Sequence, residues 1–111
     1  ERDQLSIVAD QIGSPTYAAD LATAALQLAA NDTPSGIYNF ANSGVCSWYD
    51  FAHAIFEISG TDCLLKPIST EQYPTPAKRP NYSVLNTRKI SEVTAVPRHW
   101  REALVECLGK V

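Results

Sequence analysis

The sequence has no apolar stretch near the roughly 20 residues that a membrane-spanning helix requires, and its start does not read as a charged leader followed by an apolar run. It also lacks an excess of basic residues, since the formal net charge at pH 7 is −3. A chain of this charge offers no basic face to nucleic acid or to an anionic membrane. We therefore expect a cytoplasmic protein that binds neither nucleic acid nor a membrane.

Cysteine is scarce, and its spacing excludes two common uses. Cys46, Cys63 and Cys107 are odd in number and form no C-x-x-C pair, so neither a disulfide framework nor a zinc site is indicated. We expect all three to be small buried hydrophobic residues. His53 and His99 lack neighbouring ligands at metal spacing and are expected to be partly exposed. The sequence also lacks a glycine-rich phosphate loop and any convincing Ser-His-Asp or Cys-His arrangement, so we assign no metal-binding and no catalytic residue within it.

What remains is ordinary for one folded domain of 111 residues, with 45% hydrophobic and 19% charged residues. Alternating and helical periodicities predict an α/β fold of short strands alternating with helices. The sequence enters its first expected strand directly after residues 1–4, so we expect residues 1–111 to be a single fragment. The first strand, helix and second strand should form a crossover unit with parallel pairing. The expected strands are 5–9, 36–42 and 63–68, and the expected helices are 16–30, 48–58, 69–73, 87–92 and 97–108.

Two of these helices carry further local signals. Ser47 precedes Asp50 by three residues, which is the spacing of a capping box, and Gly60 suits a left-handed helix end. The first helix is rich in alanine and leucine, so we expect it to lie flat on a sheet. Its apolar face should consist of Ala18, Leu21, Ala22, Ala25, Leu26 and Ala29.

The turn at residues 8–16 connects the first strand to the first helix. Gly13 permits unusual backbone angles, and Thr16 can cap the amides of the coming helix. The carboxyl end of a strand next to a helix N-terminus favours anions, so the turn is a candidate binding site. The alternative is a turn without a ligand. Gln11 could orient a sugar hydroxyl or a nicotinamide amide, or it could hold the turn together.

The second candidate is the proline-rich loop at residues 74–83. Three prolines within seven residues exclude a helix and keep this loop extended and stiff. Lys78 and Arg79 therefore lose little entropy on binding an anion, and a guanidinium suits phosphate or carboxylate. The alternative is a solvated basic pair.

Taken together and in order, these motifs resemble the C-terminal portion of the dTDP-4-dehydrorhamnose reductase family. The resemblance covers essentially the whole chain. It is carried by Asp-Gln-Ile-Gly-Ser-Pro-Thr at 10–16, Gly-Ile-Tyr-Asn-Phe at 36–40, Ser-Trp-Tyr-Asp-Phe-Ala at 47–52, Tyr-Pro-Thr-Pro-Ala-Lys-Arg-Pro at 73–80 and Trp-Arg-Glu-Ala-Leu at 100–104.

The resemblance implies the substrate-binding part of an extended short-chain dehydrogenase, with a Rossmann-type fold. Such enzymes reduce dTDP-6-deoxy-L-lyxo-4-hexulose to dTDP-L-rhamnose with NADPH or NADH. The cofactor and the catalytic Tyr-x-x-x-Lys pair would belong to an N-terminal domain upstream of residue 1, so the chain is expected to be an inactive fragment. Family members can form homodimers and can use Mg²⁺, for which Glu102 and Glu106 match no motif.

The resemblance also implies a substrate-binding surface for a dTDP-sugar. By it, the turn should face the active-site cleft and the Lys-Arg loop should line the nucleotide-sugar pocket. The residues concerned are Gln11, Gly13, Ser14, Thr16, Lys78 and Arg79. Two alternatives remain, a non-catalytic regulatory subunit resembling the methionine adenosyltransferase β subunit and a scaffold domain without a ligand.

Overall fold

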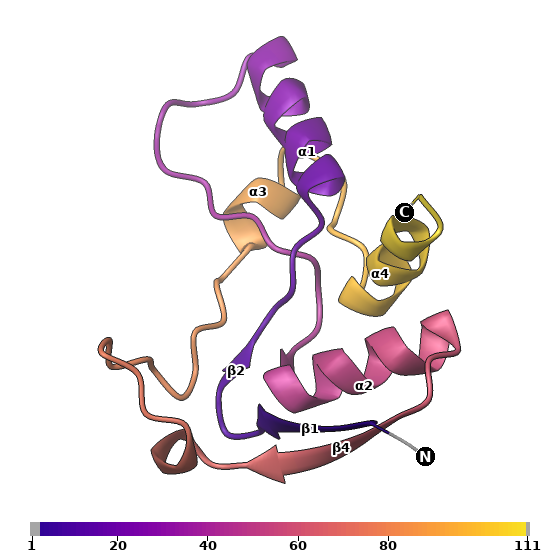
Figure 1. Ribbon diagram of the computed structural model, residues 1–111. Helices are drawn as coiled ribbons and strands as arrows, with labels where there is room; N and C mark the ends of the chain where they lie inside the picture. Colours follow the sequence, from indigo (N-terminus) through magenta and orange to yellow (C-terminus); the bar gives the residue numbers. More distant parts are fainter. Residues whose placement is uncertain (1–2, 111) are drawn as a thin grey trace. The chain divides into compact units, whose positions relative to one another are not determined.

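Figure 1 shows the computed structural model of the chain, which describes residues 3–110. The chain divides into two compact units, each built from two separate stretches of sequence. Of the described residues, unit 1 contains 3–13 and 45–84, and unit 2 contains 14–44 and 85–110. The division falls between Gly13 and Ser14, inside the turn that the sequence singled out.

Unit 1 is organised around a parallel pair of strands. β1 (Asp3–Val8) pairs with β4 (Cys63–Ile68), in a register that runs from Asp3 opposite Cys63 to Val8 opposite Ile68. Both strands were predicted. Helix α2 (Trp48–Ser59) packs against both of them, as Figure 1 shows. Parallel pairing puts the carboxyl ends of the two strands at one edge of the sheet, where ligands bind in open α/β folds.

The prediction of a strand at residues 36–42 that pairs with the first strand is wrong. Residues 37–42 form no strand, and only Ser43 makes an isolated parallel bridge, to His99. The aromatic and β-branched residues of this stretch favour a strand, but a strand also needs a neighbour in register. Ile37 is instead 82% exposed, and its carbonyl oxygen accepts a hydrogen bond from Lys89 Nζ at 3.0 Å.

A small ladder in unit 1 was not predicted. β2 (Ile12–Gly13) pairs antiparallel with β3 (Cys46–Ser47), and Ile12 also bridges Tyr82 in parallel. The Ile12 amide donates to the Asn81 carbonyl oxygen and the Ser83 amide donates to the Ile12 carbonyl oxygen, each at 2.8 Å. The end of the proline-rich loop is therefore attached to the turn after β1. The short helix η1 (Thr70–Gln72) matches the predicted helical turn.

Helix α2 begins and ends as its sequence predicts. Ser47 Oγ accepts from the Asp50 amide at 3.0 Å, and Asp50 Oδ2 accepts from the Ser47 amide at 3.1 Å, which completes the capping box. Gly60 ends the helix with φ 74°, a left-handed conformation that glycine adopts without strain.

We expect the Ser47→Ala variant to lower the free energy of unfolding by about 1 kcal/mol, because it leaves the Asp50 amide at the start of α2 without its acceptor. Urea unfolding measures this loss. Ser59→Ala, at the exposed end of the same helix, serves as the control: it removes a 3.5 Å contact to the Phe56 carbonyl oxygen and a 2.9 Å hydrogen bond with Thr61 Oγ1, both at the solvent-exposed surface. Equal losses in the two variants would contradict a role for the cap.

Unit 2 contains three helices among its described residues: α1 (Ala18–Ala30), α3 (Arg88–Ser91) and α4 (Trp100–Leu108). Its buried apolar side chains are small, apart from Ile90, Trp100 and Leu104. The full set is Ala24, Ala41, Ile90, Trp100, Ala103 and Leu104.

The predicted apolar face of α1 is wrong. All six of its residues are exposed, and Leu21 and Leu26 are 45% and 71% exposed, whereas Ala24 is buried. An alanine-rich helix offers small residues on every side, so its periodicity alone does not select the face that a neighbouring segment covers.

Two further expectations, on the helix termini, need correction. Thr16 does not cap α1, whose N-cap is Tyr17. The last helix begins at Trp100 rather than at residue 97, because His99 Nδ1 accepts from the Arg101 amide at 3.1 Å and caps it. His99 is exposed, as is His53.

The cysteine prediction is correct for one residue. Cys46 is buried, and burial together with the nearby Asp50 carboxylate raises the pKa of its thiol to about 11. Cys63 and Cys107 are only partly buried. All three are free thiols.

Candidate functional site

The carboxyl edge of the β1–β4 sheet carries a cluster of polar side chains. Asp10 follows β1, and Thr70 follows β4. Thr70 donates to the Asp10 carboxylate twice, from its backbone amide at 3.0 Å and from its hydroxyl at 2.6 Å. These two bonds stabilise the charged form of the acid, so the pKa of Asp10 is lowered. The cluster therefore keeps a carboxylate at this edge.

Gln11 belongs to the same cluster. Its amide Nε2 donates to Thr70 Oγ1 at 3.3 Å. This bond connects the turn after β1 to the turn after β4, which agrees with the interpretation that Gln11 holds the turn together. The side chain is only partly buried. A substrate role for Gln11 is therefore compatible with its place at the sheet edge and stays a prediction.

A backbone hydrogen bond attaches the loop with Lys78 and Arg79 to the turn at this edge. Arg79 lies two residues before Asn81, whose carbonyl oxygen accepts from the Ile12 amide. Both basic side chains are exposed, and within residues 3–110 neither makes an ion pair or a side-chain hydrogen bond. Their charges are thus available to an anion. Gly13 lies in β2, and a Cβ added there would stand 3.1 Å from Ser83 Oγ.

Ser14 and Thr16 lie in unit 2, on the other side of the division. Ser14 Oγ donates to the Gly44 carbonyl oxygen at 2.7 Å, and Thr16 Oγ1 donates to the Ser14 carbonyl oxygen at 3.2 Å. The structure thus groups the six predicted site residues as Gln11, Gly13, Lys78 and Arg79 in unit 1 and Ser14 and Thr16 in unit 2.

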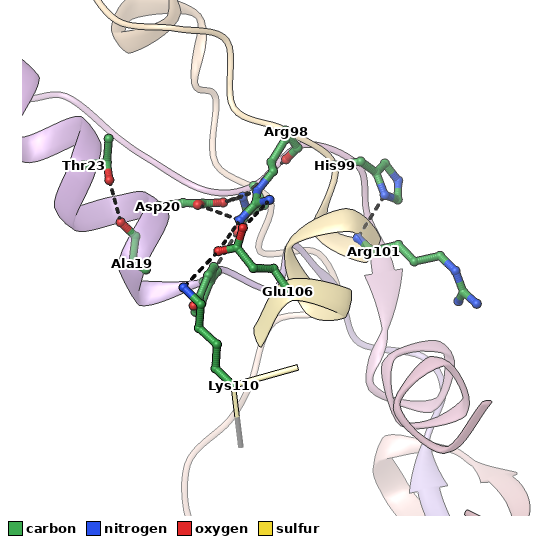
Figure 2. Close-up of polar contacts among 10 residues, drawn as sticks. Ala19, Asp20, Thr23, Arg98, His99, Arg101, Glu106 and Lys110 are labelled. Atoms are coloured by element: carbon green, nitrogen blue, oxygen red, sulfur yellow. Dashed lines mark hydrogen bonds and ion pairs between the residues drawn. The ribbon is translucent and has the colours of Figure 1, made fainter. Parts of the chain in front are cut away.

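The sequence did not predict a network of charged side chains in unit 2. Figure 2 shows Arg98 against Asp20, with Nε to Oδ2 at 2.8 Å and Nη2 to Oδ1 at 3.0 Å. This paired contact lowers the pKa of Asp20 and raises that of Arg98. Glu106 Oε1 accepts from Arg98 Nη1 at 3.3 Å, and Glu106 Oε2 lies 3.2 Å from Arg98 Nη2 and 3.6 Å from Lys110 Nζ. Asp20 and Arg98 are 78 positions apart in the sequence, so no local pattern identifies this pair.

Glu106 is therefore engaged by two cations, Arg98 and Lys110. Among residues 3–110, no three His, Cys, Asp or Glu side chains lie together in a way that could hold a metal ion. In the same part of the chain, no helix is both long and apolar enough to cross a membrane.

Known proteins resemble this chain over its whole length. The family model described as RmlD substrate binding domain matches residues 1–111. The spore coat polysaccharide biosynthesis protein SpsK of Bacillus subtilis is 51% identical over 107 residues, which cover 96% of this chain and 37% of that protein. The dTDP-4-dehydrorhamnose reductase of Mycolicibacterium smegmatis is 41% identical, with coverage of 96% and 33%. The chain thus spans about a third of the length of these relatives.

Solved structures agree with the fold. The dTDP-4-dehydrorhamnose reductase of Bacillus anthracis, solved in complex with NADP, superposes with a TM-score of 0.93 at 35% identity, over 99% of this chain and 39% of that one. The α/β architecture predicted from the sequence, part of a Rossmann-type extended short-chain dehydrogenase fold, is confirmed by this likeness.

Proposed function

The chain belongs to the RmlD substrate binding domain family, and from that membership we propose that it forms the part of a dTDP-4-dehydrorhamnose reductase that binds the nucleotide sugar. The whole enzyme would reduce dTDP-6-deoxy-L-lyxo-4-hexulose to dTDP-L-rhamnose. The observation that carries this proposal is the match of the entire chain to a substrate-binding family, together with relatives that are named as reductases.

The geometry of unit 1 supports a place for an anionic sugar nucleotide. Unpaired Lys78 and Arg79 side chains stand on a stiff loop whose end is bonded to Ile12. Because three prolines restrict the backbone angles of the loop, ordering it around a diphosphate costs little entropy. We propose that Arg79 binds the diphosphate through paired hydrogen bonds and that Lys78 adds a second positive charge.

The turn after β1 would contact the sugar end of the substrate. We propose that Gln11, held by Thr70, and the segment of Gly13, Ser14 and Thr16 bind and orient the sugar ring. A fixed ring brings its keto carbon to one position relative to the hydride donor, and such orientation accounts for much of the rate gain in two-substrate reactions. These residues would position the substrate and exchange no proton with it.

The hydride would come from NADPH or NADH, which supplies the redox chemistry when bound. The described strand-to-helix connections of this chain do not fit that cofactor. The connection from β1 to α1 contains Gly13, Ser14 and Pro15 where a dinucleotide loop has closely spaced glycines. We propose that the cofactor and the acid that protonates the product belong to a part of the enzyme outside this chain.

An assay of ketosugar-dependent NADPH oxidation tests the proposal. We expect turnover by the full-length protein that contains this chain and none by residues 1–111 alone. Robust turnover by the 111-residue chain would contradict the assignment of the reacting groups to another part of the enzyme. Failure of the full-length protein to oxidise NADPH with this ketosugar would contradict the reductase itself. The alternative of a methionine adenosyltransferase subunit receives no support from the relatives found.

A further inference from the structure

One polar side chain of unit 2 is almost completely buried and bonds to three separate segments. Asn42 is 2% exposed. Its Oδ1 accepts from the Tyr17 amide at 2.7 Å, and its Nδ2 donates to Asp20 Oδ2 at 2.8 Å and to the Arg98 carbonyl oxygen at 3.3 Å. Both ends of the amide are thus engaged where water cannot replace them, so its orientation is strongly determined.

The bond to Tyr17 does the work of a helix cap. Tyr17 is the N-cap of α1 and makes no cap bond with its own side chain. The turn from Ser14 to Tyr17 is therefore held at one end by Asn42 and at the other by the bond from Ser14 Oγ to the Gly44 carbonyl oxygen. Residues 42–44 act as a template for this turn.

The template is itself fixed to the start of α4. The Ser43 amide donates to the Arg98 carbonyl oxygen at 2.9 Å, and the Trp100 amide donates to the Ser43 carbonyl oxygen at 3.0 Å. Gly44 has φ 83°, and a Cβ there would collide with the His99 ring. The position of the template is thus set by backbone bonds that do not involve the Asn42 side chain. Removing that side chain should free the turn and leave the template in place.

We propose that Asn42 is a positioning residue for substrate binding: it fixes the backbone of the turn at residues 14–17 and so sets the affinity for the nucleotide sugar without touching it. The inference rests on the proposed function, in which Ser14 and Thr16 contact the sugar. A turn that is already ordered binds its ligand with a smaller loss of conformational entropy. Freeing the turn should therefore weaken sugar binding and leave cofactor binding unchanged.

The test uses the full-length protein and two variants of Asn42. We expect Asn42→Ala to raise the KM for the ketosugar about tenfold, as expected for the loss of one ordering hydrogen bond in a buried site, with the KM for NADPH unchanged. Asn42→Asp keeps an acceptor for the Tyr17 amide while it places a second carboxylate beside Asp20. It should restore most of the ketosugar KM although it lowers the thermal stability.

A matched control separates positioning from general destabilisation. Ile90 is 2% exposed in α3, and Ile90→Val removes a core methyl group without changing any bond to the turn. We expect wild-type KM values for this control. Equal ketosugar KM values for Asn42→Ala and Ile90→Val, or an equal rise for Asn42→Ala and Asn42→Asp, would overturn the inference.

Amide hydrogen exchange provides a readout that needs no activity. The Tyr17 amide should exchange about tenfold faster in Asn42→Ala than in the wild type, because the loss of a hydrogen bond lowers local protection. Unchanged exchange would overturn the positioning role. If the wild type fails to reduce the ketosugar, the proposed function fails, and with it the claim that Asn42 sets the affinity for the sugar. Amide hydrogen exchange still decides whether Asn42 fixes the turn.

Discussion

Replacing Arg79 with alanine raises the KM for the nucleotide sugar about tenfold or more, since a hydrogen bond to a charged group contributes roughly 1.5–3 kcal/mol. Arg79 is exposed, and within the described part of the chain its side chain has no ion pair or hydrogen bond to lose. Its removal should therefore leave the fold intact. Steady-state kinetics of the full-length enzyme with varied ketosugar measures the effect, which we expect to spare the KM for NADPH.

Arg88→Ala is the matched control for Arg79. Arg88 is also an exposed arginine, with 86% of its side chain accessible and only a 3.6 Å contact to Glu92 on the same helix. The two substitutions change the net charge equally, so a difference between them reports the position of the charge. The same ketosugar KM in both variants would remove Arg79 from the proposed binding surface. A higher salt concentration should weaken sugar binding by the wild type more than by Arg79→Ala.

The second large effect concerns the stability of unit 2. We expect Asp20→Ala to lower the free energy of unfolding by about 2–3 kcal/mol at pH 7, because it leaves partly buried donors on Arg98 and Asn42 without their acceptor. The side chains of Asp20 and Arg98 are 21% and 33% exposed, so solvent screens the pair only in part. Urea unfolding measures the loss, and Glu92→Ala, which breaks the exposed pair with Arg88, should change it little.

The same pair predicts a dependence on pH. The hydrogen bonds from Arg98 lower the pKa of Asp20 in the folded protein below its ordinary value of 3.8. An acid with a depressed folded pKa adds stability that is complete above its unfolded pKa and is lost as the pH falls through the folded one. The difference between the wild type and Asp20→Ala should therefore be constant near neutral pH and shrink below about pH 4. A difference that stays constant down to pH 2 would contradict the pairing.

Local sequence patterns predicted some features of the proposed site and missed others. The polar turn after β1 and the stiff basic loop were both found from residue types, because glycine, proline and charged pairs act through their own backbone angles and charges. Their attachment to each other through Ile12 and Asn81 was not found, since it depends on a two-residue strand with no periodicity to detect. Asn42 gave no signal at all, because a buried amide is recognised only by its partners.

Two failed predictions, the strand at residues 36–42 and the apolar face of α1, have one physical cause. The stretch at residues 36–42 has the composition of a strand, and α1 has an apolar stripe, yet neither finds in its own unit the partner that composition assumes. Whether a segment pairs as a strand, and which side of a helix is buried, depends on a second segment that packs against it. The sequence of the first segment alone does not specify that second segment.

The sequence by itself determined β1, β4 and the capped ends of α2, because capping bonds, alternation and glycine conformation are decided within a few residues. It also determined the family, since the order of its motifs spans the chain. Only the tertiary structure decided the pairing of β1 with β4, the buried side of α1 and the contacts of Asn42, Asp20 and Arg98. The side-chain contacts of Asn42 and Asp20 join residues 22 to 78 positions apart, and their free energy arises from burial and from bonds that exist only once the segments meet.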